Sequence, residues 1–340
     1  MNRQNLEDFP PPPGVLGSLR AGFDAVSSHV GLILLPVVLD LCLWLGPRLS
    51  VEALLNPFLR IIFNQAQLTL ASSTEVKQFA EFQSAFSEAM GRFNLLSLLG
   101  KLQIFPIGIS SLLAQKMPAE TPFGSQPVVQ ISSLPGVLGL AFVFVVAGWI
   151  VGGLYFRRVS ETALGGAGRE MSITALWAIL QTLLLSVIWS IALMMVLVPA
   201  MFVLAVLTLL SPVVASGAFF VMLLLAFWLI VPLFFTPHGI FVRKQNAFYS
   251  IFTSLRMARF TLPTSGLFVL CWFLLSTGLN YLWRVPPETS WMTLVGIGGH
   301  AFITTALLAA SFVYYHDMNA WLQTVFEKLQ QKQSIPMQRV

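Results

Sequence analysis

The sequence has little charge. Only 10% of its 340 residues are Asp, Glu, Lys or Arg, whereas 56% are hydrophobic. A soluble globular domain carries about 25% charged residues, so this chain lacks the polar cover that water requires. Lipid can cover that much apolar surface, which predicts an integral membrane protein.

Several functional signatures are missing as well. The sequence holds no GxxxxGK[ST] phosphate loop, no HExxH zinc motif and no carboxylate pair within one apolar segment. It has no basic run of five or more residues, which argues against nucleic-acid binding despite a net charge of +5. Cys42 and Cys271, the two cysteines, lie in apolar segments and are interpreted as small buried side chains. We therefore expect no metal, no cofactor and no enzymatic activity.

Six segments are long and apolar enough to cross a membrane, since a spanning helix needs ~20 mostly apolar residues. They are Val30–Pro47, Leu134–Phe156, Thr182–Leu210, Val213–Phe235, Leu262–Trp283 and Trp291–His316. The middle two belong to one stretch, Glu170 to Arg243, that is free of internal Asp, Glu, Lys and Arg and is interrupted at Ser211. We predict an all-α polytopic bundle of six spanning helices in three hairpins.

A weak internal repeat supports the three hairpins. Residues 20–28 and 245–254 are alike, and residues 172–180 stand in the same place before the middle pair. The first and last of these segments combine an apolar stripe with polar residues, which is typical of a helix lying in the membrane interface. We therefore expect an interfacial amphipathic helix before each hairpin.

The basic residues predict the orientation, because cytoplasmic flanks of membrane helices carry excess Lys and Arg. With the N-terminus inside, the cytoplasmic segments hold Arg3, Arg20, Arg157, Arg158, Arg169, Arg243, Lys244, Arg256, Arg259, Lys328, Lys332 and Arg339, and the short outer loops hold only Arg284. The other six basic residues lie in or beside one long outer loop, which counts for little in this rule. Both termini are expected to be cytoplasmic, in a plasma membrane.

These predictions divide the chain into five regions. They are a Pro-rich cytoplasmic tail at 1–14, an interfacial helix and first span at 15–48, an extracytoplasmic helical insertion at 49–133, the remaining five spans at 134–316, and a cytoplasmic tail at 317–340. No cleavable signal peptide is expected before the first span. Within the insertion, residues 51–70 and 76–93 have the periodicity of amphipathic helices. The more apolar residues 94–115 are expected to lie in the outer interface.

Two motifs indicate a family resemblance. Arg243-Lys-Gln-Asn-Ala-Phe-Tyr-Ser, and Tyr314-Tyr-His-Asp-Met at the end of the last span, resemble segments of uncharacterised bacterial six-helix membrane proteins. These include the membrane domain fused to some glycerophosphodiester phosphodiesterases. The likeness covers residues 15–50 and 134–320, without the insertion and without any phosphodiesterase domain. It implies a membrane module and brings no active-site residues.

Asp40 is the most unusual residue, because a carboxylate within a span costs at least ~2.5–3.5 kcal/mol to insert. It is either a proton or cation site, or a hydrogen-bonded group that fixes helix packing. His300, in Gly296-Ile-Gly-Gly-His-Ala, lies at a similar depth when residues are counted from the outer ends of the two spans. An Asp40–His300 contact would stabilise both groups and could relay protons. The alternatives for His300 are packing against small residues, or ligation of haem or chlorophyll.

Other polar residues have simpler interpretations. His29, His238 and His316 sit at predicted cytoplasmic ends of spans, where interfacial anchoring explains them. Gly148-Trp-Ile-Val-Gly152 is a GxxxG pattern, which predicts close helix packing. Ser216 could be a nucleophile with His300 as its base, but it lies at a predicted helical turn where Ser is expected anyway.

Three functions remain open at this point. The first is a non-enzymatic scaffold, assembly factor or accessory subunit, whose partners are membrane lipids and other membrane proteins. The second is a transporter or permease for a small or lipid-like solute that uses Asp40. The third is a membrane enzyme. The scarcity of intramembrane charge favours the first, because coupled transporters usually need several such groups.

Overall fold

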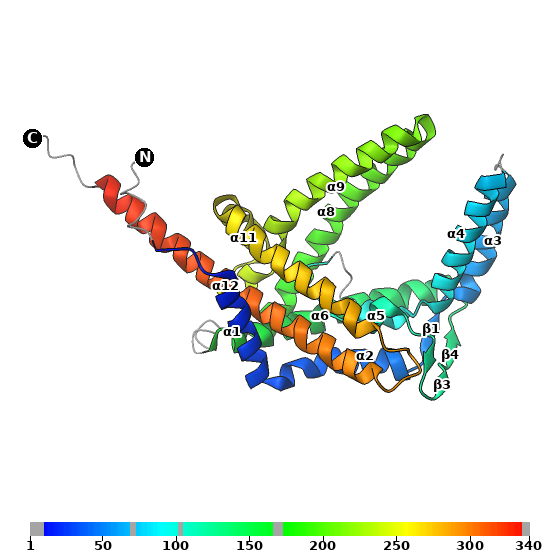
Figure 1. Ribbon diagram of the computed structural model, residues 1–340, viewed down its shortest axis with the longest axis horizontal. Coiled ribbons are helices and arrows are strands. Elements are labelled where there is room, and N and C mark those ends of the chain that lie inside the picture. The colour runs from blue at the N-terminus through cyan, green and yellow to red at the C-terminus, as the bar shows by residue number, and fades with distance from the viewer. Residues whose placement is uncertain (1–9, 69–72, 101–104, 166–172, 335–340) are drawn as a thin grey trace, which may run out of the picture. The chain divides into compact units, whose positions relative to one another are not determined.

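The computed structural model describes residues 10–68, 73–100, 105–165 and 173–334, which are mostly helical (Figure 1). In chain order the helices are α1 (Val15–Ser28), the 3-10 helix η2 (Val30–Ile33), α2 (Leu34–Leu45), α3 (Glu52–Leu68), α4 (Ser73–Arg92), the 3-10 helix η3 (Leu95–Leu99), α5 (Leu113–Lys116), α6 (Leu134–Ala163), α8 (Ala175–Leu210), α9 (Pro212–Phe234), α10 (His238–Arg243), α11 (Ala247–Arg284) and α12 (Thr293–Ser334). The short strands are β1 (Arg48–Ser50), β2 (Glu120–Thr121), β3 (Gly124–Ser125) and β4 (Val128–Gln130).

Among the described residues, four helices are long and apolar enough to cross a membrane: α6, α8, α11 and α12. The bent pair formed by α1 and residues 30–45 raises the number to five if the pair is one span. The apolar described part of α9, Pro212–Ala226, is shorter than the others. The chain is thus a helical protein with four to five candidate spans, fewer than the six that the sequence predicts.

The first predicted span differs most from the structure. Val30–Pro47 is not one long helix, because α2 has 12 residues and extends only ~18 Å. The helix before it, α1, ends at His29, whose φ of −136° and ψ of 61° are not helical. The segment that follows, Val30–Leu45, is bent by 93° from α1. A bilayer core of ~30 Å can be crossed here only by the two segments together.

The interfacial segments have different outcomes. The first forms the separate helix α1. The last forms the start of α11, which kinks at Thr261 (φ −122°, ψ 16°), two residues before Pro263. A proline within a helix lacks the N–H of one intrahelical bond and clashes with the preceding turn, which explains the kink. The prediction of a separate helix at 172–180 is wrong for its described part, because α8 runs on from Ala175 into the apolar span.

The C-terminal boundary also shifts. The last predicted span ends at His316, but α12 continues without a break to Ser334. Residues 335–340 of the predicted tail, and residues 1–9 of the N-terminal tail, lie outside the described residues. The helix continues because residues 317–334 contain neither Pro nor Gly.

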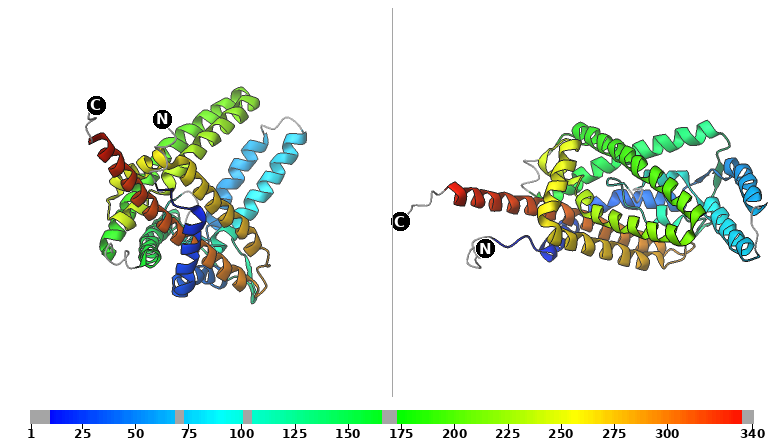
Figure 2. Two further views of the ribbon diagram at one scale, coloured as in Figure 1. Left: turned by 60° about the vertical axis from the view of Figure 1, so that its left-hand side comes forward. Right: turned by 90° about the horizontal axis from the view of Figure 1, so that it is seen from above.

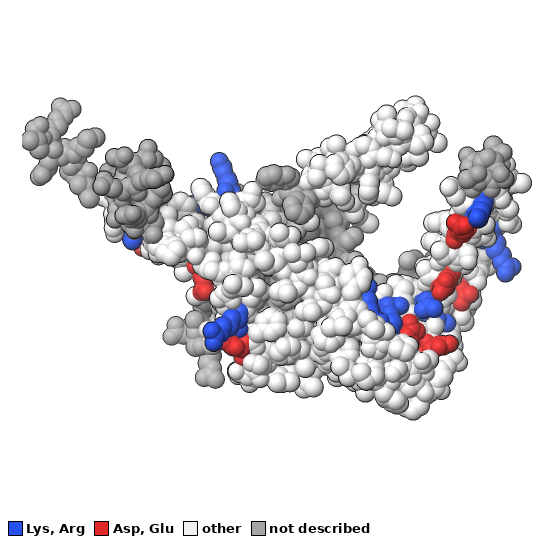
Figure 3. All heavy atoms as spheres, in the orientation of Figure 1, with Lys and Arg blue, Asp and Glu red and all other residues white. Residues whose placement is uncertain are grey.

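The chain divides into two compact units. The first is formed by Met1–Leu32, Phe156–Ser276 and Ile303–Val340. Its helices α8 and α9 are joined at Ser211 and lie side by side (Figures 1 and 2). Their surface carries no charged side chain on the face in Figure 3, and the most apolar part of α8 has no buried residue. Water cannot solvate such a hairpin favourably, so its surface requires lipid or another apolar partner.

One close contact between helices in the first unit depends on Gly22. A Cβ built on Gly22 of α1 would lie 2.4 Å from Ala310 N and 2.5 Å from Ala306 O, both in α12. Only a residue without a side chain therefore permits this approach of the two backbones. Further along α12, Trp321 donates a 2.7 Å hydrogen bond from Nε1 to the carbonyl of Pro10.

The second unit comprises Ile33–Tyr155 and Thr277–Phe302 and includes all of residues 49–133. Its helices α3 and α4 lie side by side. Phe63 of α3 packs against three rings of α4, those of Phe79, Phe82 and Phe86, with 5.9–6.5 Å between ring centroids. The two amphipathic helices expected in this region are therefore present. The strands were not expected: β1 pairs in parallel with β4, with Leu49 opposite Val129.

Candidate functional site

Asp40 lies on α2 and is completely buried in the second unit. Its Oδ1 accepts hydrogen bonds from the Ser111 hydroxyl at 2.5 Å and the Leu113 N–H at 3.0 Å. Its Oδ2 accepts the Leu112 N–H at 3.1 Å. All three donors belong to one short segment, so the carboxylate holds the chain at the start of α5.

This arrangement supplies hydrogen-bond acceptors for the N–H groups at the start of α5. The first N–H groups of a helix have no partner within the helix. The N-cap residue, Leu112, has no side-chain oxygen to accept them. Asp40 supplies that acceptor from a helix 72 positions away in sequence, and the Ser111 hydroxyl oxygen accepts the Ala114 N–H at 3.0 Å. Hydrogen bonds to a charged group contribute about 1.5–3 kcal/mol each, so the cap is a strong one.

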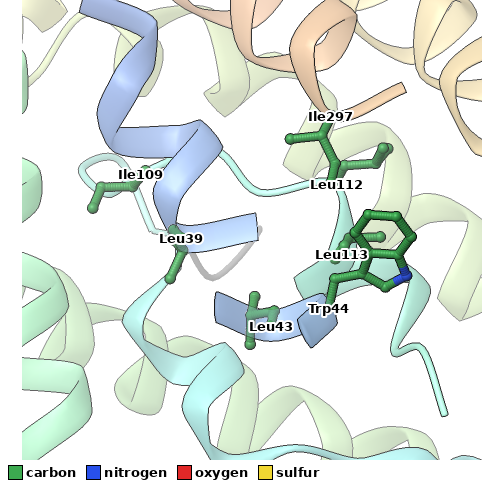
Figure 4. Close-up of a cluster of buried hydrophobic side chains, with 7 residues drawn as sticks. All are labelled: Leu39, Leu43, Trp44, Ile109, Leu112, Leu113 and Ile297. Carbon is green, nitrogen blue, oxygen red and sulfur yellow. The ribbon is translucent and has the colours of Figure 1, made fainter. Parts of the chain in front are cut away.

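The segment that Asp40 holds is itself apolar and buried. Ile109, Leu112 and Leu113 are each less than 5% exposed. Figure 4 shows these three side chains grouped with four others from α2 and α12. The complete cluster is Leu39, Leu43, Trp44, Ile109, Leu112, Leu113 and Ile297. Ile107, Ile109, Leu112 and Leu113 are therefore part of the core of the second unit. Residues 101–104 lie outside the described residues.

His300 is on α12 and is 2% exposed. Its Nε2 lies 3.2 Å from the hydroxyl of Ser110. Asp40 and His300 thus bind consecutive serines of the same segment. The sequence suggested a direct Asp40–His300 contact as one alternative; the hydrogen bonds found here run instead from each side chain to one of two adjacent serines, which the sequence did not single out.

The glycines before His300 have a clear role. A Cβ on Gly299 would lie 2.6 Å from the ring of Trp283, and one on Gly296 would lie 2.4 Å from the Trp283 carbonyl oxygen. The first turns of α12 therefore pack directly on the last turn of α11.

The end of α2 is fixed by a second set of hydrogen bonds. Gln126 donates from Nε2 to the carbonyls of Leu43 and Trp44, at 2.8 and 2.6 Å. Trp44 in turn donates from Nε1 to the carbonyl of Glu288 at 2.9 Å. The last carbonyls of α2, which have no partner in the helix, are satisfied in this way. Asp40 therefore sits in a helix that is held along its length and at its end.

The GxxxG pattern of α6 has an unexpected partner. A Cβ on Gly148 would lie 2.8 Å from the Leu99 carbonyl oxygen, and one on Gly152 would lie 2.8 Å from Gly108 Cα. The sequence predicted close packing of this helix on another helix. The groups approached are the Leu99 carbonyl, at the end of η3, and the backbone of Gly108, not another spanning helix.

Three further candidate residues were identified from the sequence: His29, His238 and Ser216. His29 is exposed, as interfacial anchoring requires. His238 is only 2% exposed, so its interpretation as an interfacial anchor is wrong. Its ring contacts those of Phe312 and Tyr315, at 4.7 and 5.6 Å between centroids, and Nε2 lies 2.7 Å from the Ser311 hydroxyl. Ser216 is exposed and donates to the Pro212 carbonyl of its own helix at 2.9 Å.

Within the part of the chain that the structure describes, no group of three His, Cys, Asp or Glu side chains is placed to hold a metal ion. His316 bonds from Nδ1 to its neighbour Asp317 at 3.0 Å.

No protein-family model matches this chain, and comparison with curated proteins and with solved structures finds no significant match.

Four residues of this region were not predicted from the sequence: Ser110, Ser111, Gln126 and Glu288. One signal was present for the serines: they form an adjacent polar pair within the apolar run Ile107-Gly-Ile-Ser-Ser-Leu-Leu. A buried polar group requires a partner, so two adjacent hydroxyls in such a run indicate bonding partners elsewhere. Gln126 and Glu288 act through backbone carbonyls and N–H groups, which leave no trace in sequence.

Proposed function

We propose that this chain is a non-enzymatic integral membrane module that acts as a scaffold, assembly factor or accessory subunit. The observation that supports it most is how the buried polar groups are used. Asp40 and the Ser111 hydroxyl bond each other and the backbone of the chain itself. These groups build a rigid core, as expected of a structural protein.

A transporter is the alternative, and its requirements are different. A coupling carboxylate must exchange a proton or an ion during each cycle, so its oxygens need access to solvent or solute. Asp40 has no exposed surface, and three donors of one segment engage its two oxygens. Releasing them would free residues 111–113 from the core. This large cost favours the structural role.

The membrane arrangement we propose has six crossings, with both termini in the cytoplasm of a cell bounded by a plasma membrane. The distribution of basic residues supports the orientation. Helix α9 has 23 residues and would cross next to α8. The bent α1–α2 segment would make the remaining crossing.

Contacts inside each unit support a crossing by that bent segment. In the first unit Pro10 accepts a hydrogen bond from Trp321. In the second unit Trp44 donates one to Glu288. Each contact fixes one end of the N-terminal segment against the C-terminal part of the chain, within its own unit.

One surface available to partners, on α3 and α4, combines apolar and charged side chains. On α3, Phe58, Ile61 and Ile62 are each about 60% exposed, at the helical spacing of one face. Charged side chains also lie along α3 and α4 (Figure 3). Membrane lipids and other membrane proteins are the partners that this combination suits. The relation to the membrane domain fused to some glycerophosphodiester phosphodiesterases remains a hypothesis.

Isolation from native membranes tests the proposal. The chain is extracted in nanodiscs formed directly from those membranes, and bound proteins and lipids are identified by mass spectrometry. We expect a defined protein partner that an Ile61→Ser/Ile62→Ser variant loses, whereas a variant with Lys77→Gln on α4 retains it. Reconstituted wild-type protein that moves a solute across vesicles, together with a folded Asp40→Asn variant that does not, would overturn the proposal in favour of transport.

A further inference from the structure

A cavity of about 370 Å³ opens in the second unit where α11 has ended and α12 has not yet begun. It is lined by Arg92, Lys116, Ala119, Glu120, Arg284, Val285, Pro286, Pro287, Glu288 and Thr289. Its volume lies within the range of ligand pockets, ~300–1,000 Å³. Because Arg284 is the last residue of a candidate spanning helix, the cavity belongs to a segment that emerges from the membrane.

The charges around this cavity are not balanced. Three of the lining residues are cationic and two are anionic. Arg92 is the cation with carboxylate partners, Glu88 at 3.3 Å and Glu288 at 3.5 Å. Among the described residues, Lys116 and Arg284 have no carboxylate oxygen within 4.0 Å. Two positive charges therefore face one cavity without an ion pair.

Neutral atoms hold these two cations in place. Lys116 donates from Nζ to the Pro286 carbonyl at 2.6 Å. Arg284 donates from one terminal nitrogen to the Gln115 side-chain oxygen, which also accepts from Asn280 at 3.2 Å. The Nε of Arg284 is buried and has no partner among the described residues. The guanidinium is thus positioned but retains unused hydrogen-bonding capacity.

The pKa of Lys116 depends on its burial and on the charges of its neighbours. Burial lowers the pKa of Lys116 below its ordinary 10.5, Glu288 acts in the opposite direction, and the charge of Arg284 lowers it further. The two cations are therefore close enough to repel each other. A bound anion would remove that repulsion.

We propose that this cavity binds a phosphate group, with Arg284 and Lys116 as the residues that recognise it. A guanidinium presents a planar pair of donors that matches a phosphate, and a lysine ammonium adds a point charge. The carboxylates of Glu120 and Glu288 can accept hydrogen bonds from hydroxyl groups beside the phosphate. A phosphoglycerol group has this combination, either as the headgroup of an anionic lipid or as a soluble phosphate ester.

Binding in two settings distinguishes these sources. The protein is reconstituted in phosphatidylcholine nanodiscs, and glycerol phosphate is titrated while the thermal unfolding midpoint is recorded. In a second series, increasing fractions of phosphatidylglycerol replace phosphatidylcholine, and retained lipid is identified by native mass spectrometry. Saturable binding in the first series assigns the site to soluble phosphates, and saturable binding in the second series alone assigns it to the lipid.

The variants are Arg284→Gln and Lys116→Gln, and the matched control is Arg60→Gln, which changes an exposed cation of α3 outside the cavity. We expect each cavity variant to weaken binding at least about tenfold and the control to leave it unchanged. Circular dichroism establishes which variants are folded, and Lys116→Gln decides the outcome if Arg284→Gln is not. No saturable binding in either series, or an equal loss in Arg60→Gln, would show that the cations form only a structural polar cluster.

Discussion

The Ser111 hydroxyl donates a 2.5 Å hydrogen bond to Asp40, and with it joins α2 to a segment 71 positions later in the chain. Ser111 acts twice, because its oxygen also accepts the Ala114 N–H. The pair explains why a carboxylate is tolerated in so apolar a chain. Its oxygens replace water with donors that are fixed in position.

This pair gives a stability prediction. Asp40→Asn leaves an amide NH2 where an oxygen accepted one backbone N–H, and Ser111→Ala removes both contacts of the hydroxyl. We expect each substitution to reduce the free energy of unfolding by about 1–3 kcal/mol. Because the two residues interact directly, the double variant should lose less than the sum of the single losses. Thermal unfolding in nanodiscs measures all three.

The matched control for this cycle is Ser216→Ala, which removes an exposed hydroxyl bonded within its own helix. We expect it to change stability by less than about 0.5 kcal/mol. Strictly additive effects of Asp40→Asn and Ser111→Ala would show that the bond between them contributes nothing.

Gly152 gives a second prediction. Gly152→Ala would place a Cβ 2.8 Å from Gly108 Cα, where only backbone can yield. Overpacking of this kind costs about 1–3 kcal/mol. Gly139→Ala is the control on the same helix, because its Cβ would meet nothing within 4 Å. Equal unfolding midpoints of the two variants would contradict the packing of α6 on the 95–109 region.

These two cases indicate what sequence can predict. The apolar runs predict helices and their approximate bounds, because length and hydropathy alone decide which segments can cross a membrane. Asp40, His300 and the α6 glycines were identified because each is costly or unusual in its segment. Their partners were not, because these are hydroxyls, backbone N–H groups and carbonyls of residues 95–113. Any sequence supplies such groups, so only the tertiary structure selects them.

The titration of Lys116 gives a third prediction. Its pKa is lower in the folded protein than the ordinary 10.5 of the unfolded chain, mainly because of burial. Between the lower pKa of the folded protein and 10.5, the unfolded state binds more protons than the folded state. The free energy of unfolding should therefore rise with pH in that window. Lys116→Gln should remove this contribution. Unfolding midpoints of both proteins, recorded from neutral pH to above 10.5, measure it; the same rise in the variant would contradict the assignment to Lys116.

Cysteine labelling of intact cells tests the proposed orientation. Cys42 and Cys271 are first replaced by serine, and single cysteines are then introduced as Glu81→Cys on α4 and Arg243→Cys on α10. An impermeant reagent should label the first and not the second, because residues 49–133 are expected outside and the basic Arg243 segment inside. Labelling at Arg243→Cys alone would reverse the orientation. Protection of both would require an even number of crossings between residues 81 and 243, so α6, α8 and α9 would not all cross.

A hydrogen bond between the residues that flank α3 and α4 bears on which changes in length this protein tolerates. Leu49, just before α3, donates its N–H to the side-chain oxygen of Asn94, just after α4, at 3.1 Å. The chain therefore leaves and rejoins the core at one point. The cost of closing a longer loop grows by only ~0.6 kcal/mol for each doubling of its length. Residues can be added or removed at the far end of α3 and α4 without moving the segment that Asp40 holds, so this hairpin can vary in length, or be exchanged for another, while the core remains the same.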